Sequence, residues 1–272
     1  MGRSPAVTLD AVAKIFPGKA APALVDVSAA IEPGQFVAII GKSGAGKTTL
    51  LRCLSRALPV TGGSIRFDRV DLGGLRGRAL RAHRARVGMI YQQFNLVKRL
   101  RVVDNVLIGR LGRLRGFAGW AALARHFDPR QRAIAFRCLD HVGLLDRVWQ
   151  RTDTLSGGEQ QRVAIAKILA QEPAVILADE PVASLDLSNG RLVMQTLRRV
   201  ASAAGITVLA TLHHVAYARS YADRILGLKA GRVVFDGPAS RLTDAALFEI
   251  FGEFEPEPAL DGGERIDALA AP

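Results

Sequence analysis

Residues 41–48, GKSGAGKT, form a glycine-rich stretch between the apolar run FVAII at 36–40 and a helical pattern. Glycines in such a strand-to-helix turn let the backbone wrap closely and point successive N–H groups at phosphate oxygens. The start of the helix adds a partial positive charge. In this context the spacing G-x-x-x-x-G-K-T predicts a nucleotide phosphate loop. Lys47 is expected to reach the β- and γ-phosphates of ATP, and the Thr48 hydroxyl to ligate Mg²⁺.

The rest of the chain alternates short β-branched runs with longer helical patterns, which favours an α/β fold with a largely parallel sheet covered by helices. Residues 100–150 contain no convincing strand, so an inserted helical subdomain is expected there. From Glu253 the composition becomes acidic and rich in Pro and Gly without apolar periodicity, which predicts a disordered tail over 253–272. The other expected elements are a helix at 48–58 and strands at 87–91, 174–178, 206–210, 224–228 and, antiparallel near an edge, 232–236.

Two acids, Asp179 and Glu180, directly follow the apolar strand predicted at 174–178. Adjacent carboxylates at a strand end are by themselves typical of a solvated turn. The phosphate loop changes the interpretation, because its metal needs a carboxylate from a neighbouring strand. Asp179 is therefore predicted to interact with Mg²⁺, and Glu180 to act as the general base that polarises a water for in-line attack.

A second glycine turn, LSGGEQQR at 155–162, opens another helix with Ser156 as its expected N-cap. This is also an anion-binding helix start. One chain does not need two such sites for one nucleotide. A head-to-tail pair of chains does, because each chain can then cap the ATP that the other holds.

With these three motifs in place, the chain resembles the ATP-binding subunit of an ABC transporter over residues 8–252. The resemblance implies a P-loop NTPase core of the ABC type with an antiparallel β subdomain. It places a nucleotide-binding domain over 6–252, with the helical subdomain inserted at about 94–160. ATP and Mg²⁺ are the implied cofactors.

The resemblance also implies roles for individual residues. Glu180, His213 and Lys47 would be catalytic, and Thr48, Gln92 and Asp179 would hold the metal. The choice of His213 over His214, and of Gln92 over Gln93, rests on alignment. The implied nucleotide contacts are Phe16, Gly41, Lys42, Ser43, Gly44, Ala45, Gly46, Lys47, Thr48, Thr49, Gln92, Ser156, Gly157, Gly158 and Asp186.

No uninterrupted apolar run approaches the ~18 residues of a membrane span, and the N-terminus lacks the apolar stretch of a secretion signal. The chain resembles the stand-alone ATPase subunit of a bacterial importer, peripheral at the cytoplasmic face of the inner membrane. Such subunits form a homodimer on integral membrane permease subunits, which an external solute-binding protein supplies with cargo.

Three stretches, at 105–120, 177–186 and 212–237, resemble the phosphonate importer ATPases and imply a phosphonate-transporting ATPase. Two alternatives stay open. One is an importer for phosphate, phosphite, methionine or polar amino acids. The other is an ABC-type ATPase that acts on nucleic acid.

The formal charge of +12 lies in the middle of the chain, because residues 66–151 hold 19 Lys/Arg and 6 Asp/Glu. This excess fits a solvated arginine-rich surface, a lipid surface or a polyanionic partner. No specific nucleic acid is expected as a partner, since the arginines are not interleaved with stacking aromatics. The two cysteines, Cys53 and Cys138, fit a reducing compartment and are expected to be buried apolar residues. The partnerless histidines His83, His126 and His141 are expected at the surface.

Overall fold

The computed structural model describes residues 4–19, 21–114 and 127–253. It contains two sheets. The larger has six strands in the order β10-β9-β3-β8-β7-β6, all parallel except β10, which pairs antiparallel with β9 at the edge. Its strands are β3 (Phe36–Ile40), β6 (Val87–Ile90), β7 (Val175–Asp179), β8 (Thr207–Thr211), β9 (Arg224–Lys229) and β10 (Arg232–Pro238).

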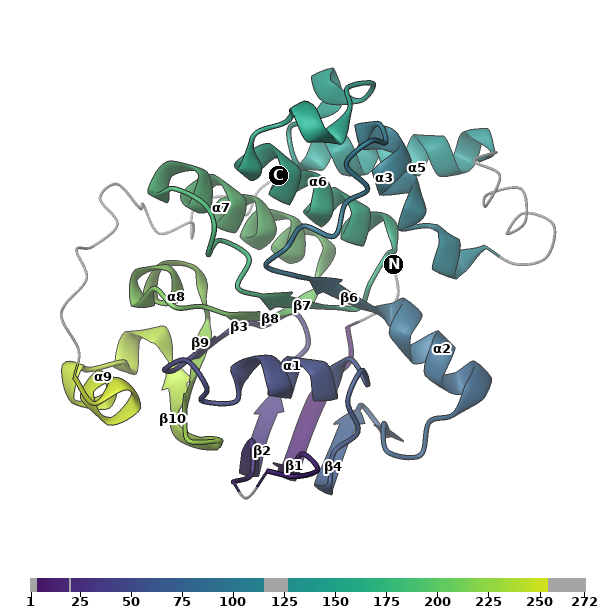
Figure 1. Ribbon diagram of the computed structural model, residues 1–272. Coiled ribbons are helices and arrows are strands. Elements are labelled where there is room, and N and C mark those ends of the chain that lie inside the picture. The colour runs from purple at the N-terminus through teal and green to yellow at the C-terminus, as the bar shows by residue number, and fades with distance from the viewer. Residues whose placement is uncertain (1–3, 20, 115–126, 254–272) are drawn as a thin grey trace.

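The smaller sheet is antiparallel, in the order β2-β1-β4-β5. Figure 1 shows it below the larger sheet, with helix α1 on the same side and α6 and α7 on the opposite side. The strands are β1 (Val7–Lys14), β2 (Leu24–Ile31), β4 (Gly62–Phe67) and β5 (Val70–Asp71). The helices are α1 (Lys47–Leu54), α2 (Gly77–Arg86), α3 (Val102–Ile108), α5 (Pro129–His141), α6 (Gly157–Ala170), α7 (Leu187–Ala204), α8 (Val215–Tyr221) and α9 (Asp244–Phe251).

Both faces of the larger sheet are buried, which explains why its strands are uninterrupted apolar runs. In β3, Phe36, Ala38 and Ile40 belong to the core beneath the helices α3, α5, α6 and α7. Val37 and Ile39 alternate with them and belong to the core that α1 shares with the antiparallel sheet. The strand period of two therefore divides one apolar run between two cores, and the predicted α/β fold with an antiparallel β subdomain is confirmed.

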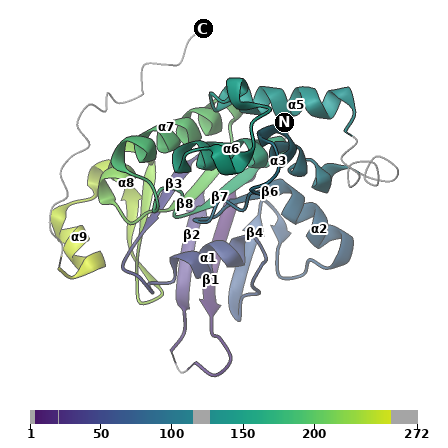
Figure 2. The same ribbon diagram turned by 45° about the horizontal axis from the view of Figure 1, so that its top comes forward.

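The inserted region is helical where it is described: α3, α5 and α6 lie together on one side of the larger sheet (Figures 1 and 2). Its one β contact among the described residues is an isolated bridge between Arg101 and Arg151. The domain boundaries at 6–252 and about 94–160 stay a prediction. The disordered tail predicted from Glu253 lies outside the described residues after its first position.

The prediction of a helix over 48–58 is wrong at the C-terminal end, because α1 stops at Leu54. Two residues later, Arg56 adopts a left-handed conformation with φ 57°. Such a residue just beyond a helix reverses the chain and satisfies the last carbonyls. Here the Arg56 N–H donates to the Cys53 carbonyl and the Leu58 N–H donates to the Arg52 carbonyl. Leu58 continues the apolar spacing of the helix because it packs against the same core from outside the helix.

The two cysteines are buried and free, as predicted. Burial raises the pKa of each thiol, Cys53 and Cys138, to about 11. Because the thiolate is the reactive form, both behave as small apolar side chains.

The predicted surface position of His83 is wrong. It is the buried residue of α2, packed edge-on against Phe67 with 4.9 Å between ring centroids. Its Nε2 lies 3.2 Å from the Leu54 carbonyl oxygen. Burial lowers the pKa of this imidazole, so the folded protein holds it neutral.

The lowered pKa of His83 gives the free energy of unfolding a predictable pH dependence. Above the unfolded pKa of about 6.5 the ring is neutral in both states and its contribution is complete. As the pH falls below that value the unfolded chain binds the proton more readily, so stability declines. We expect denaturant unfolding between pH 7.5 and 5.5 to show a smaller pH slope in His83→Gln than in the wild type. Equal slopes would contradict a neutral buried imidazole.

Candidate functional site

The phosphate loop connects β3 to α1, and two of its glycines are required by close backbone approaches. A Cβ on Gly41, where φ is 151°, would lie 2.2 Å from the Leu228 carbonyl oxygen in β9. A Cβ on Gly46, where φ is 103°, would lie 2.5 Å from the Ala23 carbonyl oxygen. The loop is thus held between β9 and Ala23, the residue before β2, and both approaches exclude any larger residue.

Hydrogen bonds hold the middle of the same loop. The Ala45 N–H donates to the Lys42 carbonyl, and the Ala45 carbonyl accepts from the Gly231 N–H of the β9–β10 turn, each at 3.1 Å. Lys42, Ser43 and Gly44 are exposed on the outer side of the loop. The predicted phosphate contacts therefore lie on a loop whose backbone is fixed from two sides.

Lys47 is the first residue of α1 and is buried, with 5% of its surface exposed. Its Nζ donates to the Gly41 carbonyl at 2.7 Å and to the Lys42 carbonyl at 3.2 Å. Burial lowers the pKa of this ammonium, while the charges of Glu180 and Asp179 act in the opposite direction. The side chain thus spans the phosphate loop and faces the acidic end of β7.

The acidic end of β7 meets α1 and β8 at one carboxylate. The Thr48 hydroxyl donates to Asp179 Oδ1 at 2.9 Å, and the Thr211 hydroxyl donates to the same oxygen at 2.9 Å. The parallel register of β7 and β8 pairs Asp179 with Thr211 directly. Carboxyl ends of neighbouring parallel strands share one edge, so residues far apart in the sequence converge here.

Glu180 follows Asp179 in a left-handed conformation, with φ 51°. This conformation costs a non-glycine residue about 1–3 kcal/mol and is typical of functional sites. The Glu180 N–H donates to the Thr211 hydroxyl at 2.9 Å, and its Oε1 lies 2.5 Å from His213 Nε2. The structure therefore joins Glu180 to His213, two residues past the end of β8. His214 is instead the N-cap residue of α8, 6.0 Å from the Tyr217 ring.

The donor set at this edge fits Mg²⁺. Thr48 and Asp179 offer only oxygen atoms, which are the ligands that this ion takes from proteins, usually one or two beside substrate phosphates. Among the described residues no group of three or more His, Cys, Asp or Glu could hold a metal ion by itself. Mg²⁺ in proteins usually keeps waters and substrate phosphates among its ligands.

The second glycine turn begins α6 with a complete capping box. The Ser156 hydroxyl accepts from the Glu159 N–H at 3.3 Å, and Glu159 Oε2 accepts from the Ser156 N–H at 2.9 Å. The Ser156 backbone N–H lowers the pKa of the Glu159 carboxyl. The predicted N-cap is confirmed, and none of the capping hydrogen bonds involves Gly157 or Gly158.

Gly158 is instead needed for packing, because a Cβ there would lie 2.6 Å from Asn189 Oδ1 in α7. The Asn189 side-chain amide donates to Asp186 Oδ2 at 2.6 Å, and its backbone N–H donates to Asp186 Oδ1 at 3.0 Å. That backbone bond, with bonds from Ser188 and the Asn189 side chain, holds the pKa of Asp186 well below its usual range. The glycine turn and the residues after Glu180 thus form one packed surface.

Gln92 lies on the loop after β6, and Phe16 lies on the loop that joins β1 to β2. Gln92 is exposed two residues beyond β6, whose last residue, Ile90, pairs with Ala178 of β7. It therefore follows the same edge of the sheet as Glu180. Phe16 is half-buried two residues beyond β1, with the Lys14 ammonium 5.4 Å from its ring centroid. Thr49 lies half-buried in α1.

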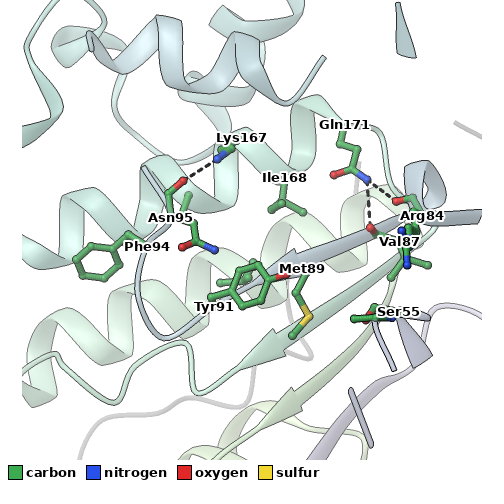
Figure 3. Close-up of a pocket in the computed structure, with 13 residues that line it drawn as sticks. Ser55, Arg84, Val87, Met89, Tyr91, Phe94, Asn95, Lys167, Ile168 and Gln171 are labelled. Atoms are coloured by element: carbon green, nitrogen blue, oxygen red, sulfur yellow. Dashed lines mark hydrogen bonds between the residues drawn. The ribbon is translucent and has the colours of Figure 1, made fainter. Parts of the chain in front are cut away.

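A cavity of about 570 Å³ opens beside the Gln92 loop, between β6, α6 and the end of α1 (Figure 3). Tyr91 and Phe94 from the loop and Ile168 from α6 form its apolar part. The Lys167 ammonium donates to the Asn95 carbonyl at 2.7 Å and so ties α6 to this loop. With Arg84, this lysine makes the lining cationic, and no acid is among the described lining residues.

Sequence reasoning did not single out Thr211 or Asn189. Thr211 ends an apolar strand, where a β-branched residue is an ordinary strand former. The available signal was its place two residues before His213 on the strand next to Asp179. Asn189 gave no separate signal, because the close approach to Gly158 depends on how α6 and α7 pack.

Comparison with known proteins relates the chain to one family, the ABC transporters. The sequence profile of the ABC transporter family matches residues 24–183. A Phosphonates import ATP-binding protein from Rhodopseudomonas palustris is 47% identical over 250 residues, 92% of this chain and 89% of that protein. Its counterpart from Bradyrhizobium diazoefficiens is 50% identical over 229 residues, 84% of each chain.

Among solved structures, the chain is similar to a dimeric ATP-binding cassette in a post-hydrolysis state with ADP and phosphate bound. The TM-score is 0.74 at 33% identity, covering 86% of this chain and 98% of that one. The predicted P-loop NTPase core of the ABC type is therefore confirmed. The chain belongs to the ABC transporter family, as one of its ATP-hydrolysing subunits.

Proposed function

We propose that the chain is the ATP-hydrolysing subunit of a bacterial importer for phosphonates, and that it uses the residues gathered at the ends of β7 and β8. The observation that carries the catalytic part is the bonded group of Thr48, Asp179, Glu180 and His213 beside the phosphate loop. The cargo is supported by identities of 47% and 50% to phosphonates import ATP-binding proteins over most of the chain.

In this proposal the phosphate loop binds the nucleotide and fixes the γ-phosphate in line with a water. Glu180 accepts a proton from that water while the water oxygen bonds to the γ-phosphorus. The bond between the γ-phosphorus and the bridging oxygen of the β-phosphate breaks, which leaves ADP and phosphate. His213 holds the Glu180 carboxylate in place through the bond to its Oε1. Thr48, Asp179 and Gln92 would hold Mg²⁺, which would neutralise charge on the phosphates.

Each nucleotide is proposed to lie between two copies of the chain. Phe16 would stack on the adenine, residues 41–49 would hold the phosphates, and the partner would add its Ser156, Gly157 and Gly158. Asp186 lies on the same packed surface as this turn, so it would reach the nucleotide across the dimer as well. The dimeric ADP-bound relative supports this arrangement.

The permease subunits are proposed to dock in the cavity beside Gln92. Its apolar wall and two cations suit a helical segment that carries an acidic side chain. Among the described residues no helix is both long enough and apolar enough to cross a membrane. The proposed location is peripheral, on the cytoplasmic face of the inner membrane, where the permease of such an importer would hold the ATPase dimer; the similarity to phosphonates import ATP-binding proteins supports it.

The cargo is tested by reconstituting the chain with its permease and external binding protein in lipid vesicles. We expect the binding protein loaded with methylphosphonate to stimulate ATP turnover, and the same protein offered phosphate or methionine to stimulate less. The control is the reconstituted complex carrying Lys47→Ala, which should not respond to any cargo. Strongest stimulation by phosphate or methionine would contradict the phosphonate assignment. Co-purification with nucleic acid instead of a permease would contradict the importer itself.

A further inference from the structure

We propose that Thr211 is a positioning residue for ATP hydrolysis, one that fixes the orientation of both the metal-binding carboxylate and the general base. This inference rests on the proposed function, since it takes Asp179 and Glu180 in the roles given above. No motif assigns a role to Thr211. Its hydroxyl nevertheless bonds both residues at the reacting end of β7, Asp179 and Glu180.

The hydrogen bonds of the Thr211 hydroxyl use its only proton. A threonine hydroxyl has one proton to donate and two lone pairs to accept with. Thr211 donates its single proton to Asp179 Oδ1 at 2.9 Å and accepts the Glu180 N–H at 2.9 Å. The side chain is fully buried. One hydroxyl therefore orients two consecutive residues of the proposed site.

The bond to Glu180 matters because of the backbone there. With φ 51°, Glu180 leaves the strand geometry of β7, and its N–H turns to the Thr211 hydroxyl. A partly buried N–H without an acceptor is unfavourable. Without the hydroxyl, the turn that aims the Glu180 carboxylate at His213 loses its support.

The bond from Thr211 to Asp179 orients the carboxylate that is proposed to bind Mg²⁺. Two threonine hydroxyls, from Thr48 in α1 and Thr211 in β8, approach Asp179 Oδ1 from two different elements. Together they restrict the rotation of the carboxylate. Removing the Thr211 hydroxyl leaves it held from the α1 side only, so the metal requirement of the reaction should change as well as its rate.

The same strand offers a matched control. Thr207, at the other end of β8, is also fully buried, and its hydroxyl accepts the Gly34 N–H at 2.9 Å. Thr207→Val removes an equally buried hydroxyl from the same strand, away from the phosphate loop. Valine keeps the β-branched shape in both variants, so the strand is preserved.

The experiment uses the full chain and compares Thr211→Val, Thr211→Ser, Thr207→Val and Glu180→Gln with the wild type. For each variant kcat, KM for ATP, the half-saturating Mg²⁺ concentration, binding of a fluorescent ATP analogue and the denaturant unfolding midpoint are measured. We expect Thr211→Val to lower kcat about 10-fold or more, which is ~1.4 kcal/mol of transition-state stabilisation. It should also raise the Mg²⁺ requirement while leaving analogue binding without Mg²⁺ nearly unchanged. Thr211→Ser should restore both parameters, and Thr207→Val should affect only the unfolding midpoint.

The possible failures are distinguishable. A folded Thr211→Val with the kcat and Mg²⁺ dependence of the wild type, beside an inactive Glu180→Gln, overturns the role of Thr211 alone. A fully active Glu180→Gln overturns the proposed catalytic site instead. Equal loss of kcat in Thr207→Val and Thr211→Val would reduce the effect to general destabilisation and would also overturn the inference.

Discussion

Replacing Glu180 with glutamine is expected to leave ATP binding intact and to reduce kcat by ~10²–10⁴, the usual contribution of a general base. Glutamine has the same length, and its carbonyl oxygen can still accept from His213 Nε2, which lies 2.5 Å from Glu180 Oε1. The left-handed backbone at φ 51° suits either residue equally. The change thus removes proton acceptance and little else. Equilibrium binding of a fluorescent ATP analogue and single-turnover hydrolysis measure the two halves of the prediction.

The chain contains a matched control at the opposite end of β7. Glu172 also has a positive φ, 53°, and precedes the strand that Glu180 follows. It pairs with Arg110 at 3.1 Å, away from the phosphate loop. Glu172→Gln should keep the kcat of the wild type. If Glu180→Gln turned over ATP as rapidly as Glu172→Gln, the general base would have to be another residue.

Two separately inactive variants, Lys47→Ala and Ser156→Asp, are expected to regain hydrolysis when they are mixed. Lys47→Ala disables the phosphate loop of its own chain. Ser156→Asp keeps a good N-cap for α6 but, in the proposed dimer, would place a negative charge toward the γ-phosphate of the partner's nucleotide. The substitution also removes the Ser156 hydroxyl, which is a hydrogen-bond donor. Losing a donor preorganised for the transition state costs ~10²–10³ in kcat. In a mixed head-to-tail dimer, one site combines the intact loop of one chain with the intact turn of the other.

Random pairing makes half of the dimers mixed, so roughly a quarter of all sites are intact by this symmetry. The measurement is steady-state ATPase activity across mixing ratios, with Ser156→Asn as the neutral N-cap control. A maximum near equal amounts is expected. Activity that stays at the level of each variant alone would mean that Ser156 acts within its own chain, and the shared-nucleotide arrangement would be wrong.

Much of this site could be predicted from short sequence patterns. The glycine spacing around Lys47, the acids that end an apolar strand and the serine–glycine turn each depend on local backbone chemistry. The apolar run of β3 is local as well, because a strand buried on both faces must be apolar throughout, but its division between two cores is set by the packing of the fold. Local patterns failed at element ends, as at Leu54, where a left-handed Arg56 ended the helix. They also failed at His83, whose burial depends on Phe67 and Leu54.

The sequence by itself determined the phosphate loop, the fold class and the family, since these depend on residue types at fixed spacing. Only the tertiary structure decided which side chains meet at the edge of the larger sheet. Thr48, Asp179 and Thr211 are separated by 131 and 32 residues along the chain, yet two hydroxyls bond one carboxylate oxygen. The physical reason is the parallel register of β7 and β8, which aligns their ends and which no single segment encodes.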